Sequence, residues 1–285
     1  MNAFSRSWEI TKLSFNVMKQ DKELFLFPII AGIASLAFIA AMAIPTIVTA
    51  FLKNEALSGL LFYGILFLIY LGLAIIATFF NVCVVHTVKT RFEGKNATFA
   101  ESLRFAFSRF GVILAWSLLA ATVGLILRAI GSIAERLGGI GELIIKITTS
   151  LLGAAWAIIT VFVIPSMVYR DFGPAAAIKD SIAALKKTWG ESLVRHFGLG
   201  IAQFVMILAG VVVFIALGIL AAPLGAGGLL TVLALAVLYF VAVIVFFSLA
   251  NAIFNTALYS YAQTGKVPQG YPQNVVAGAF GSAQR

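Results

Sequence analysis

The sequence predicts an all-α, polytopic membrane protein with six transmembrane helices, built as three repeats of an interfacial amphipathic helix and a helical hairpin. Of the 285 residues, 61% are hydrophobic and 11% are charged, and a soluble domain of this length has no interior large enough for so much apolar surface. Each of six apolar stretches contains the roughly 20 helical residues that cross about 30 Å of hydrocarbon. None alternates with a period of two, which argues against a β-barrel.

The apolar stretches give the order of the spans, which we place near 24–51, 57–88, 111–130, 147–169, 197–221 and 229–262. The second and sixth stretches are longer than a crossing needs, so we expect these helices to tilt or to project beyond the membrane. Pro45 and Pro165 lie inside the first and fourth spans and should kink them. The uncharged segment 222–228 predicts a tight outer turn between the last two spans.

Basic residues are distributed unevenly between the connecting segments. The segments 1–23, 89–109, 170–196 and 263–285 carry 16 of the 20 Lys and Arg residues, and the opposite side carries Lys53, Arg128, Arg136 and Lys146. Because membrane proteins keep Lys and Arg on the cytoplasmic side, both termini are predicted to be cytoplasmic. The formal net charge of +9 follows from this topology, so we expect no nucleic-acid partner.

Two cytoplasmic segments repeat each other. Segments 91–111 and 170–190 align without gaps at an offset of 79 residues, and Ser102 and Ser181 are among the identical positions. Apolar residues in each segment are spaced by four, three and four residues, which places them in one stripe of an α-helix. The stripes are Phe99, Leu103, Ala106 and Phe110 in the first segment, and Ile178, Ile182, Leu185 and Trp189 in the second.

The N-terminus carries a third version of this stripe at an offset of 95 residues, with Phe4, Trp8, Thr11 and Phe15, and with Ser7 in the place of Ser102. Each of the three segments is followed by two predicted spans. We therefore expect one membrane domain over residues 1–263, with repeats of about 1–90, 91–169 and 170–263. Residues 264–285 are rich in Gly, Pro and Gln and indicate a loose cytoplasmic tail.

Amphipathic helices of this kind lie in the headgroup layer, where Lys and Arg meet anionic lipid. The expected partners are therefore membrane lipids, with anionic headgroups at the cytoplasmic face. The alternative is that these helices only anchor the bundle at the interface. The candidate lipid-interface residues are Trp8, Phe15, Phe110, Lys186, Lys187 and Trp189.

Three amides form a candidate intramembrane polar cluster. Asn81 lies in the second span, and Asn251 and Asn255 lie four residues apart on one face of the sixth. Because hydrocarbon cannot satisfy an amide, these side chains should point into the bundle. They could hold helices together, or they could line a path for a solute or an ion.

The sequence gives no positive sign of catalysis. Cys83 is the single cysteine and the two histidines, His86 and His196, are far apart, so a zinc site is not expected. The familiar nucleophile, metalloprotease and nucleotide-binding motifs do not occur. We expect no enzyme activity, no catalytic residues, no cofactor and no metal.

The opening segment, from Ser7 to Pro28, includes Lys19-Gln20-Asp21-Lys22-Glu23-Leu24 followed by an apolar run that begins with Phe27-Pro28. It resembles the start of an uncharacterised prokaryotic family, catalogued as a domain of unknown function. The resemblance implies an all-α, six-span domain in a bacterial or archaeal plasma membrane. It implies no activity and no site residues.

Two functions remain open from the sequence. The first is a non-enzymatic integral plasma-membrane protein that acts as a scaffold, an assembly factor or a lipid-organising component, as a homo-oligomer or with a partner membrane protein. The amphipathic helices and the scarcity of charge within the spans favour it. The alternative is a channel or transporter for a small solute, which the three amides and the proline positions favour.

Overall fold

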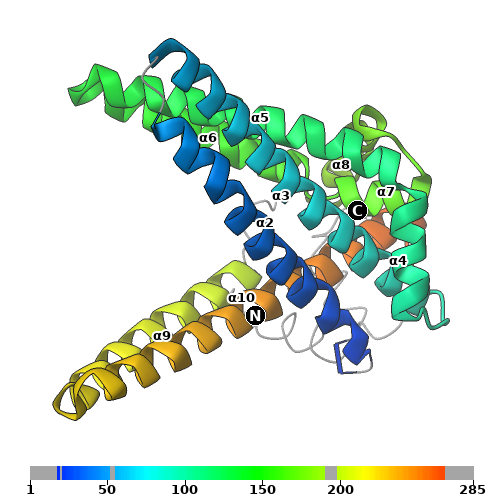
Figure 1. The fold of residues 1–285 in the computed structure, drawn as a ribbon. Coiled ribbons are helices and arrows are strands. Elements are labelled where there is room, and N and C mark those ends of the chain that lie inside the picture. The colour runs from blue at the N-terminus through cyan, green and yellow to red at the C-terminus, as the bar shows by residue number, and fades with distance from the viewer. Residues whose placement is uncertain (1–17, 20, 52–54, 190–197, 267–285) are drawn as a thin grey trace. The chain divides into compact units, whose positions relative to one another are not determined.

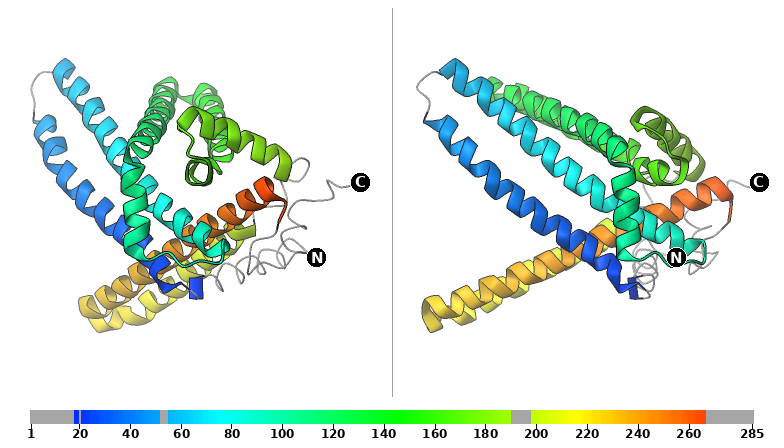
Figure 2. Two further views of the ribbon diagram at one scale, coloured as in Figure 1. Left: turned by 90° about the vertical axis from the view of Figure 1, so that its right-hand side faces the viewer. Right: turned by 45° about the vertical axis from the view of Figure 1, so that its right-hand side comes forward.

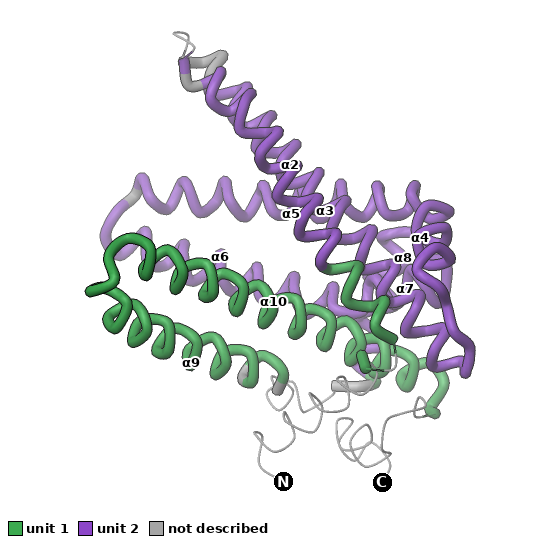
Figure 3. Tube along the Cα trace, turned by 60° about the horizontal axis from the view of Figure 1, so that its bottom comes forward, with its two compact units in different colours: residues 1–28, 187–285 green, residues 29–186 purple. Residues whose placement is uncertain are grey.

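The computed structural model describes residues 18–19, 21–51, 55–189 and 198–266. Its elements over these residues are all helices, with no strand, so the predicted all-α class is confirmed (Figure 1). The chain divides into two compact units. Unit 1 comprises Met1–Pro28 and Lys187–Arg285, and unit 2 comprises Ile29–Lys186 (Figure 3).

Unit 2 contains most of α2 (Leu26–Ala50) and the long helix α3 (Glu55–Phe92), followed by α4 (Phe99–Ser108), α5 (Phe110–Leu137), α6 (Gly139–Ile159), α7 (Val163–Arg170) and most of α8 (Pro174–Trp189). The Trp116 ring of α5 stacks on that of Trp156 in α6, with 5.9 Å between centroids. The helices α5 and α6 meet at Gly138 and Gly139, whose φ angles of 63° and 56° suit glycine.

The fourth predicted span is two helices. The helix α6 ends at Ile159, residues 160–162 form a turn, and α7 begins at Val163. Pro165 is the third residue of α7, in the first helical turn, where a missing N–H does not break the helix. The break therefore lies just before the proline. Pro45, by contrast, lies inside α2, which continues to Ala50.

Buried side chains in unit 2 gather at one end. In α3 they run from Thr78 to Val88, α7 is buried from Pro165 to Val168, and α6 has no buried residue. We call this region, where α4 and α7 contact the C-terminal turns of α3, the packed end.

Unit 1 contains η1 (Lys22–Phe25), α9 (Gly198–Ala221), η3 (Ala222–Leu224) and α10 (Gly225–Thr264). The helices α9 and α10 lie side by side and are joined by η3 at the predicted outer turn (Figures 1 and 2). The Tyr239 ring lies over Gly210, and its hydroxyl donates a hydrogen bond to the Met206 carbonyl at 2.8 Å. The short helix η1 packs against α10.

Five stretches of the described chain are long and apolar enough to cross a membrane. They are Lys22–Thr49, Gly59–Phe92, Phe110–Arg136, Gly139–Arg170 and Ala202–Thr264, the last of which contains most of α9 and all of α10. The membrane character of the chain therefore holds. The helices α3 and α10, predicted to exceed the length of a crossing, have 38 and 40 residues.

Candidate functional site

The helix α4 begins with a capping box. The Thr98 backbone N–H donates to Glu101 Oε2 at 2.8 Å, and the Glu101 N–H donates to Thr98 Oγ1 at 3.3 Å. These reciprocal bonds satisfy donors that a helix start leaves open. The hydrogen bonds with the Thr98 backbone and side chain also hold the pKa of the Glu101 carboxyl below its usual value.

Ser102 fastens α4 to the end of α3. It is fully buried, and its Oγ lies 2.7 Å from Thr87 Oγ1 and 3.3 Å from His86 Nδ1. Thr87 already donates its proton to the Cys83 carbonyl at 3.0 Å. Ser102 therefore donates to Thr87 and accepts from His86, whose neutral form carries its proton on Nδ1. The His86 ring also stacks on Phe105 of α4, with centroids 4.1 Å apart.

Ser181 fastens α8 to the break between α6 and α7. It is fully buried; its Oγ donates to the Ile159 carbonyl at 2.6 Å and accepts from the Phe162 N–H at 3.1 Å. Next to it, Asp180 Oδ2 accepts a hydrogen bond from Ser166 Oγ at 2.8 Å.

The backbone geometry at the break between α6 and α7 explains why the Ser181 hydroxyl both donates and accepts a hydrogen bond. In an unbroken helix, Phe162 would donate to the Ile158 carbonyl and Val163 to the Ile159 carbonyl. Instead, Val161 donates to Ile158 at 3.3 Å and Val163 donates to Thr160 at 3.1 Å. The break thus frees one N–H and one carbonyl, and Ser181 satisfies both. Broken helices at membrane depth require such partners.

Residues of the two contacts stand at the offset found in the sequence, but their hydrogen bonds differ: Ser102 bonds to Thr87, whereas Ser166 bonds to Asp180 and not to Ser181. Ser181 follows Ser102 by 79 residues, and Ser166 follows Thr87 by the same number. Both serines are buried, and Thr87 and Ser166 each bond to the short helix that follows, α4 or α8. Sequence reasoning aligned Ser102 with Ser181 but missed Thr87 and Ser166. Extending the same alignment backwards into the spans would have found them.

The exposed face of α8 carries a group of cations. In α8, Lys179, Lys186 and Lys187 are exposed, and their spacing places them on one helix face. Ala177, Ser181 and Ala184 are buried on the opposite face. In α4, the exposed residues include Arg104 and Phe107, opposite Ser102 and Ala106. Each helix therefore presents a small, serine-centred face to the protein, and α8 presents a cationic face outward.

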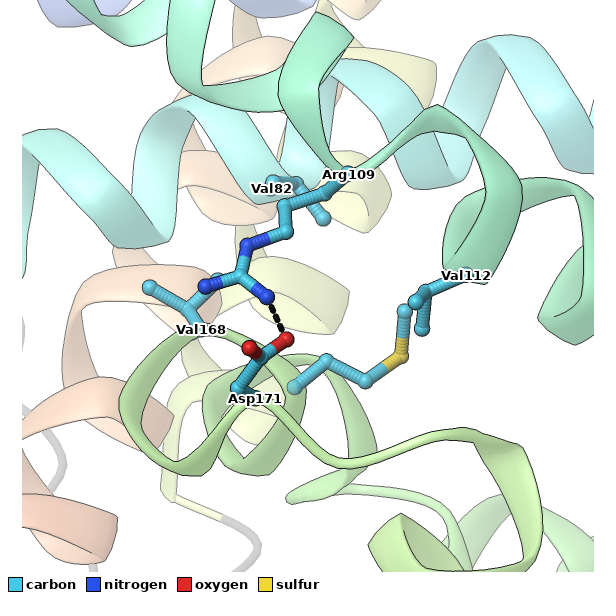
Figure 4. A pocket seen from close by; sticks show the side chains of 6 residues that line it. Val82, Arg109, Val112, Val168 and Asp171 are labelled. Atoms are coloured by element: carbon cyan, nitrogen blue, oxygen red, sulfur yellow. Dashed lines mark ion pairs between the residues drawn. The ribbon is translucent and has the colours of Figure 1, made fainter.

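An ion pair joins the turns that follow α4 and α7. Arg109 pairs with Asp171, which adopts a left-handed conformation with φ of 58° (Figure 4). The pair borders a recess with Val82, Val112, Met167 and Val168. This recess is ≈ 10 Å³, room for about one water molecule, so it is too small for a solute or a lipid chain.

The predicted amides lie in different units. Asn81, in unit 2, is half-buried, and its Oδ1 is buried without a hydrogen-bond partner. Asn251 and Asn255 are half-buried in α10 of unit 1. The role of the amides stays a prediction.

The predicted lipid-interface residues are partly described. Phe110 is the first residue of α5 and is 42% exposed. Lys186 and Lys187 are exposed, and Trp189 is the last residue of α8. Trp8 and Phe15 lie outside the described residues. Among the described residues, no three His, Cys, Asp or Glu side chains form a group that could hold a metal ion.

Comparison with known families identifies the family to which the chain belongs. The model of DUF6159, a family of unknown function, matches residues 60–269, and the chain belongs to this family. The predicted resemblance to an uncharacterised family is thereby confirmed. No curated protein matches the chain. The family name carries no activity, so a functional proposal depends on the geometry alone.

Proposed function

We propose that this member of DUF6159 is a non-enzymatic protein of the prokaryotic plasma membrane that organises anionic lipid at the cytoplasmic face. Six spans cross the membrane and both termini are cytoplasmic. Support for the fifth and sixth crossings comes from the stretch Ala202–Thr264, in which η3 separates two apolar helices. Support for the orientation comes from the 16 basic residues on one side.

The proposal includes an internal repeat. The buried serines of α4 and α8 support it, because Ser102 and Ser181 stand 79 residues apart, as Thr87 and Ser166 do. Near each serine, hydrogen bonds join a short helix to the helix or turn that precedes it. A repeat of this kind holds several amphipathic helices at one membrane face, which is the arrangement that a lipid-organising protein needs.

The observation that carries the lipid proposal is the division of α8 into two faces. The buried serine face fixes the helix to the protein, and Lys179, Lys186 and Lys187 are left exposed together. A basic side chain near an anionic bilayer surface contributes about 1 kcal/mol. Three lysines on one rigid helix therefore favour anionic over zwitterionic headgroups.

Native mass spectrometry of protein taken from bilayers of phosphatidylglycerol and phosphatidylcholine tests this proposal. We expect wild-type protein to retain mainly phosphatidylglycerol, and the Lys179→Gln, Lys186→Gln, Lys187→Gln variant to lose that preference. The matched control removes three charges from the predicted outer side, with Arg128→Gln, Arg136→Gln and Lys146→Gln. Equal loss in both triple variants, or no loss in either, would contradict lipid binding by α8.

Thiol labelling tests the proposed topology. Lys53→Cys and Glu135→Cys should react in intact cells with an impermeant reagent, whereas Lys95→Cys and Lys186→Cys should react only after lysis. Replacing Cys83 by Ala removes the background. Labelling of either cytoplasmic position in intact cells would contradict the orientation.

A second candidate function is transport of a small solute, alone or as an oligomer. Asn81 favours it, because a buried carbonyl oxygen without a hydrogen-bond partner is a place for a water or a polar ligand. Flux of small solutes into proteoliposomes tests this candidate. Flux that Asn81→Leu or Asn251→Leu abolishes in folded protein would replace the lipid proposal.

A further inference from the structure

The exposed side of α8 carries two lysines at a fixed separation. Lys179 and Lys186 are both exposed and stand seven residues apart. Seven residues are close to two helical turns, so the two side chains leave the helix on the same side, about 10.5 Å apart along its axis. The two lysines therefore form a row, with one cation at each end, which we call the lysine row.

Hydrogen bonds and packing hold the lysine row in a fixed orientation. On the opposite side of α8, Ser181 is fully buried and bonds to the Ile159 carbonyl and to the Phe162 N–H. Ala177 and Ala184 are buried on the same side. Rotation of α8 would break these contacts. A ligand that binds both lysines therefore meets a helix whose backbone is already positioned, which favours binding.

The acidic residue of α8 is held away from the lysine row. Asp180 Oδ2 accepts a hydrogen bond from Ser166 Oγ at 2.8 Å, and Ser166 is a fully buried residue of α7. The carboxylate of Asp180 is therefore turned toward α7. The residue between the two lysines on the exposed side is Ala183. Its short side chain leaves room for a headgroup to lie along the helix between the two cations.

Apolar side chains lie beside the lysine row. Ile178 and Ile182 are four residues apart and half-buried, and the helical period places them between the buried serine face and the lysines. Acyl chains can pack on such an apolar flank while the headgroup meets the cations, as in helices that lie at the membrane surface. This combination of apolar and cationic side chains fits a lipid rather than a free phosphate ion.

A lipid with two linked phosphates can use both ends of the lysine row at once. A lipid with a single phosphate binds at one lysine, and a second such lipid must be immobilised separately at the other. When the two phosphates are joined, the second contact is intramolecular, so its effective concentration is high if the linker spans the sites. The flexible four-carbon stem of lysine allows each ammonium group to adjust its position to a glycerol-linked pair of phosphates.

We infer that the lysine row of α8 binds a lipid with two phosphates, of the diphosphatidylglycerol class, in preference to phosphatidylglycerol. Lys179 and Lys186 each contact one phosphate, and Ile178 and Ile182 contact the acyl chains. This inference rests on the proposed function and names the class of anionic lipid that the exposed face of α8 selects.

Native mass spectrometry of the full chain tests the inference. The protein is taken from phosphatidylcholine bilayers that contain diphosphatidylglycerol and phosphatidylglycerol in amounts matched in total phosphate. The decisive variant is Lys179→Gln with Ala183→Lys, which keeps the number of lysines in α8 but brings the two ends of the row within one turn. The matched control is Ala183→Gln, which changes the same exposed position and keeps both lysines of the row.

We expect wild-type protein and the Ala183→Gln control to retain diphosphatidylglycerol several-fold more than phosphatidylglycerol. The Lys179→Gln, Ala183→Lys variant should lose this advantage and still retain phosphatidylglycerol in preference to phosphatidylcholine. Equal retention of the two anionic lipids by the wild type, a comparison that needs no variant, overturns the inference and leaves the proposed function standing. An unchanged advantage in the Lys179→Gln, Ala183→Lys variant does the same. Retention of neither anionic lipid above phosphatidylcholine overturns the proposed function and the inference together.

Discussion

Replacing Ser181 by alanine removes a hydroxyl that satisfies two backbone groups at once. The Phe162 N–H and the Ile159 carbonyl both bond to Ser181 Oγ, so the alanine variant loses two hydrogen bonds to the backbone. An unsatisfied buried polar group costs about 1–3 kcal/mol. Two such groups lose their partner, so we expect Ser181→Ala to lower the free energy of unfolding by about 2–4 kcal/mol.

The matched control is Ser102→Ala, the corresponding change in α4. Thr87 keeps its hydrogen bond to the Cys83 carbonyl, so this variant leaves no backbone group unsatisfied there. The expected loss is about 1–2 kcal/mol, from two side-chain hydrogen bonds, one to Thr87 and one from the half-buried His86. The comparison within one chain separates the cost of open backbone groups from the cost of a lost serine.

The buried Cys83 provides the assay. A dye that fluoresces on reaction with thiols reports unfolding as this single cysteine becomes accessible during heating in detergent. Hydrogen exchange of the peptide that contains Phe162 supplies a local readout, and Ser181→Ala should accelerate it while Ser102→Ala should not. Equal destabilisation by the two substitutions, with no local change at Phe162, would refute the hydrogen-bond account of the break.

The remaining predictions concern three other features. Hydrogen bonds at the start of α4 lower the pKa of Glu101 from 4.5. The contribution of this cap to stability is therefore present above pH 4.5 and is lost as the pH falls through the lower pKa of the folded state. Hydrogen exchange in the first turn of α4 should become faster at that pH, and Glu101→Gln should remove this pH dependence. Asp171 has φ of 58°, so Asp171→Gly should be more stable than Asp171→Ala by about 1 kcal/mol in thermal unfolding, since both lose the carboxylate and only glycine tolerates the angle freely. Gly210→Ala would push a Cβ into the Tyr239 ring and should lower the free energy of unfolding by about 1–3 kcal/mol. Gly218→Ala, with nothing within 4 Å of its Cβ, should be close to neutral. Equal melting temperatures for the two variants would contradict the packing of α9 on α10.

The helical class and the membrane character follow from hydropathy, because a long apolar stretch needs no knowledge of its neighbours to be recognised. The position of the break in the fourth span did not follow. Pro165 indicated a kink, but the turn at residues 160–162 also depends on Ser181, which lies 19 residues after Phe162 and on another helix. Tertiary partners of that kind leave no periodic signal.

The candidate sites were also predicted only in part, because their tertiary contacts leave no periodic signal in the sequence. The repeat alignment brought Ser102 and Ser181 together because identity is visible in sequence, while Thr87 and Ser166 differ in residue type and lie inside apolar runs. The exposed lysines of α8 were visible as charges on an amphipathic helix. The face buried opposite them includes Leu185 of the predicted apolar stripe but is otherwise made of Ala177, Ser181 and Ala184. Such small residues allow helices to approach closely.

The central claim is that the exposed face of α8 contacts anionic lipid, and a fluorophore on that face tests it most directly. Ala183 is exposed between Lys179 and Lys186, so Ala183→Cys in a Cys83→Ala background carries the label, and brominated lipids quench it on contact. The same label at Glu135→Cys, on the predicted outer side, is the control. The account predicts stronger quenching by brominated phosphatidylglycerol than by brominated phosphatidylcholine at position 183 and equal quenching at position 135. Equal quenching by the two lipids at position 183 would contradict it.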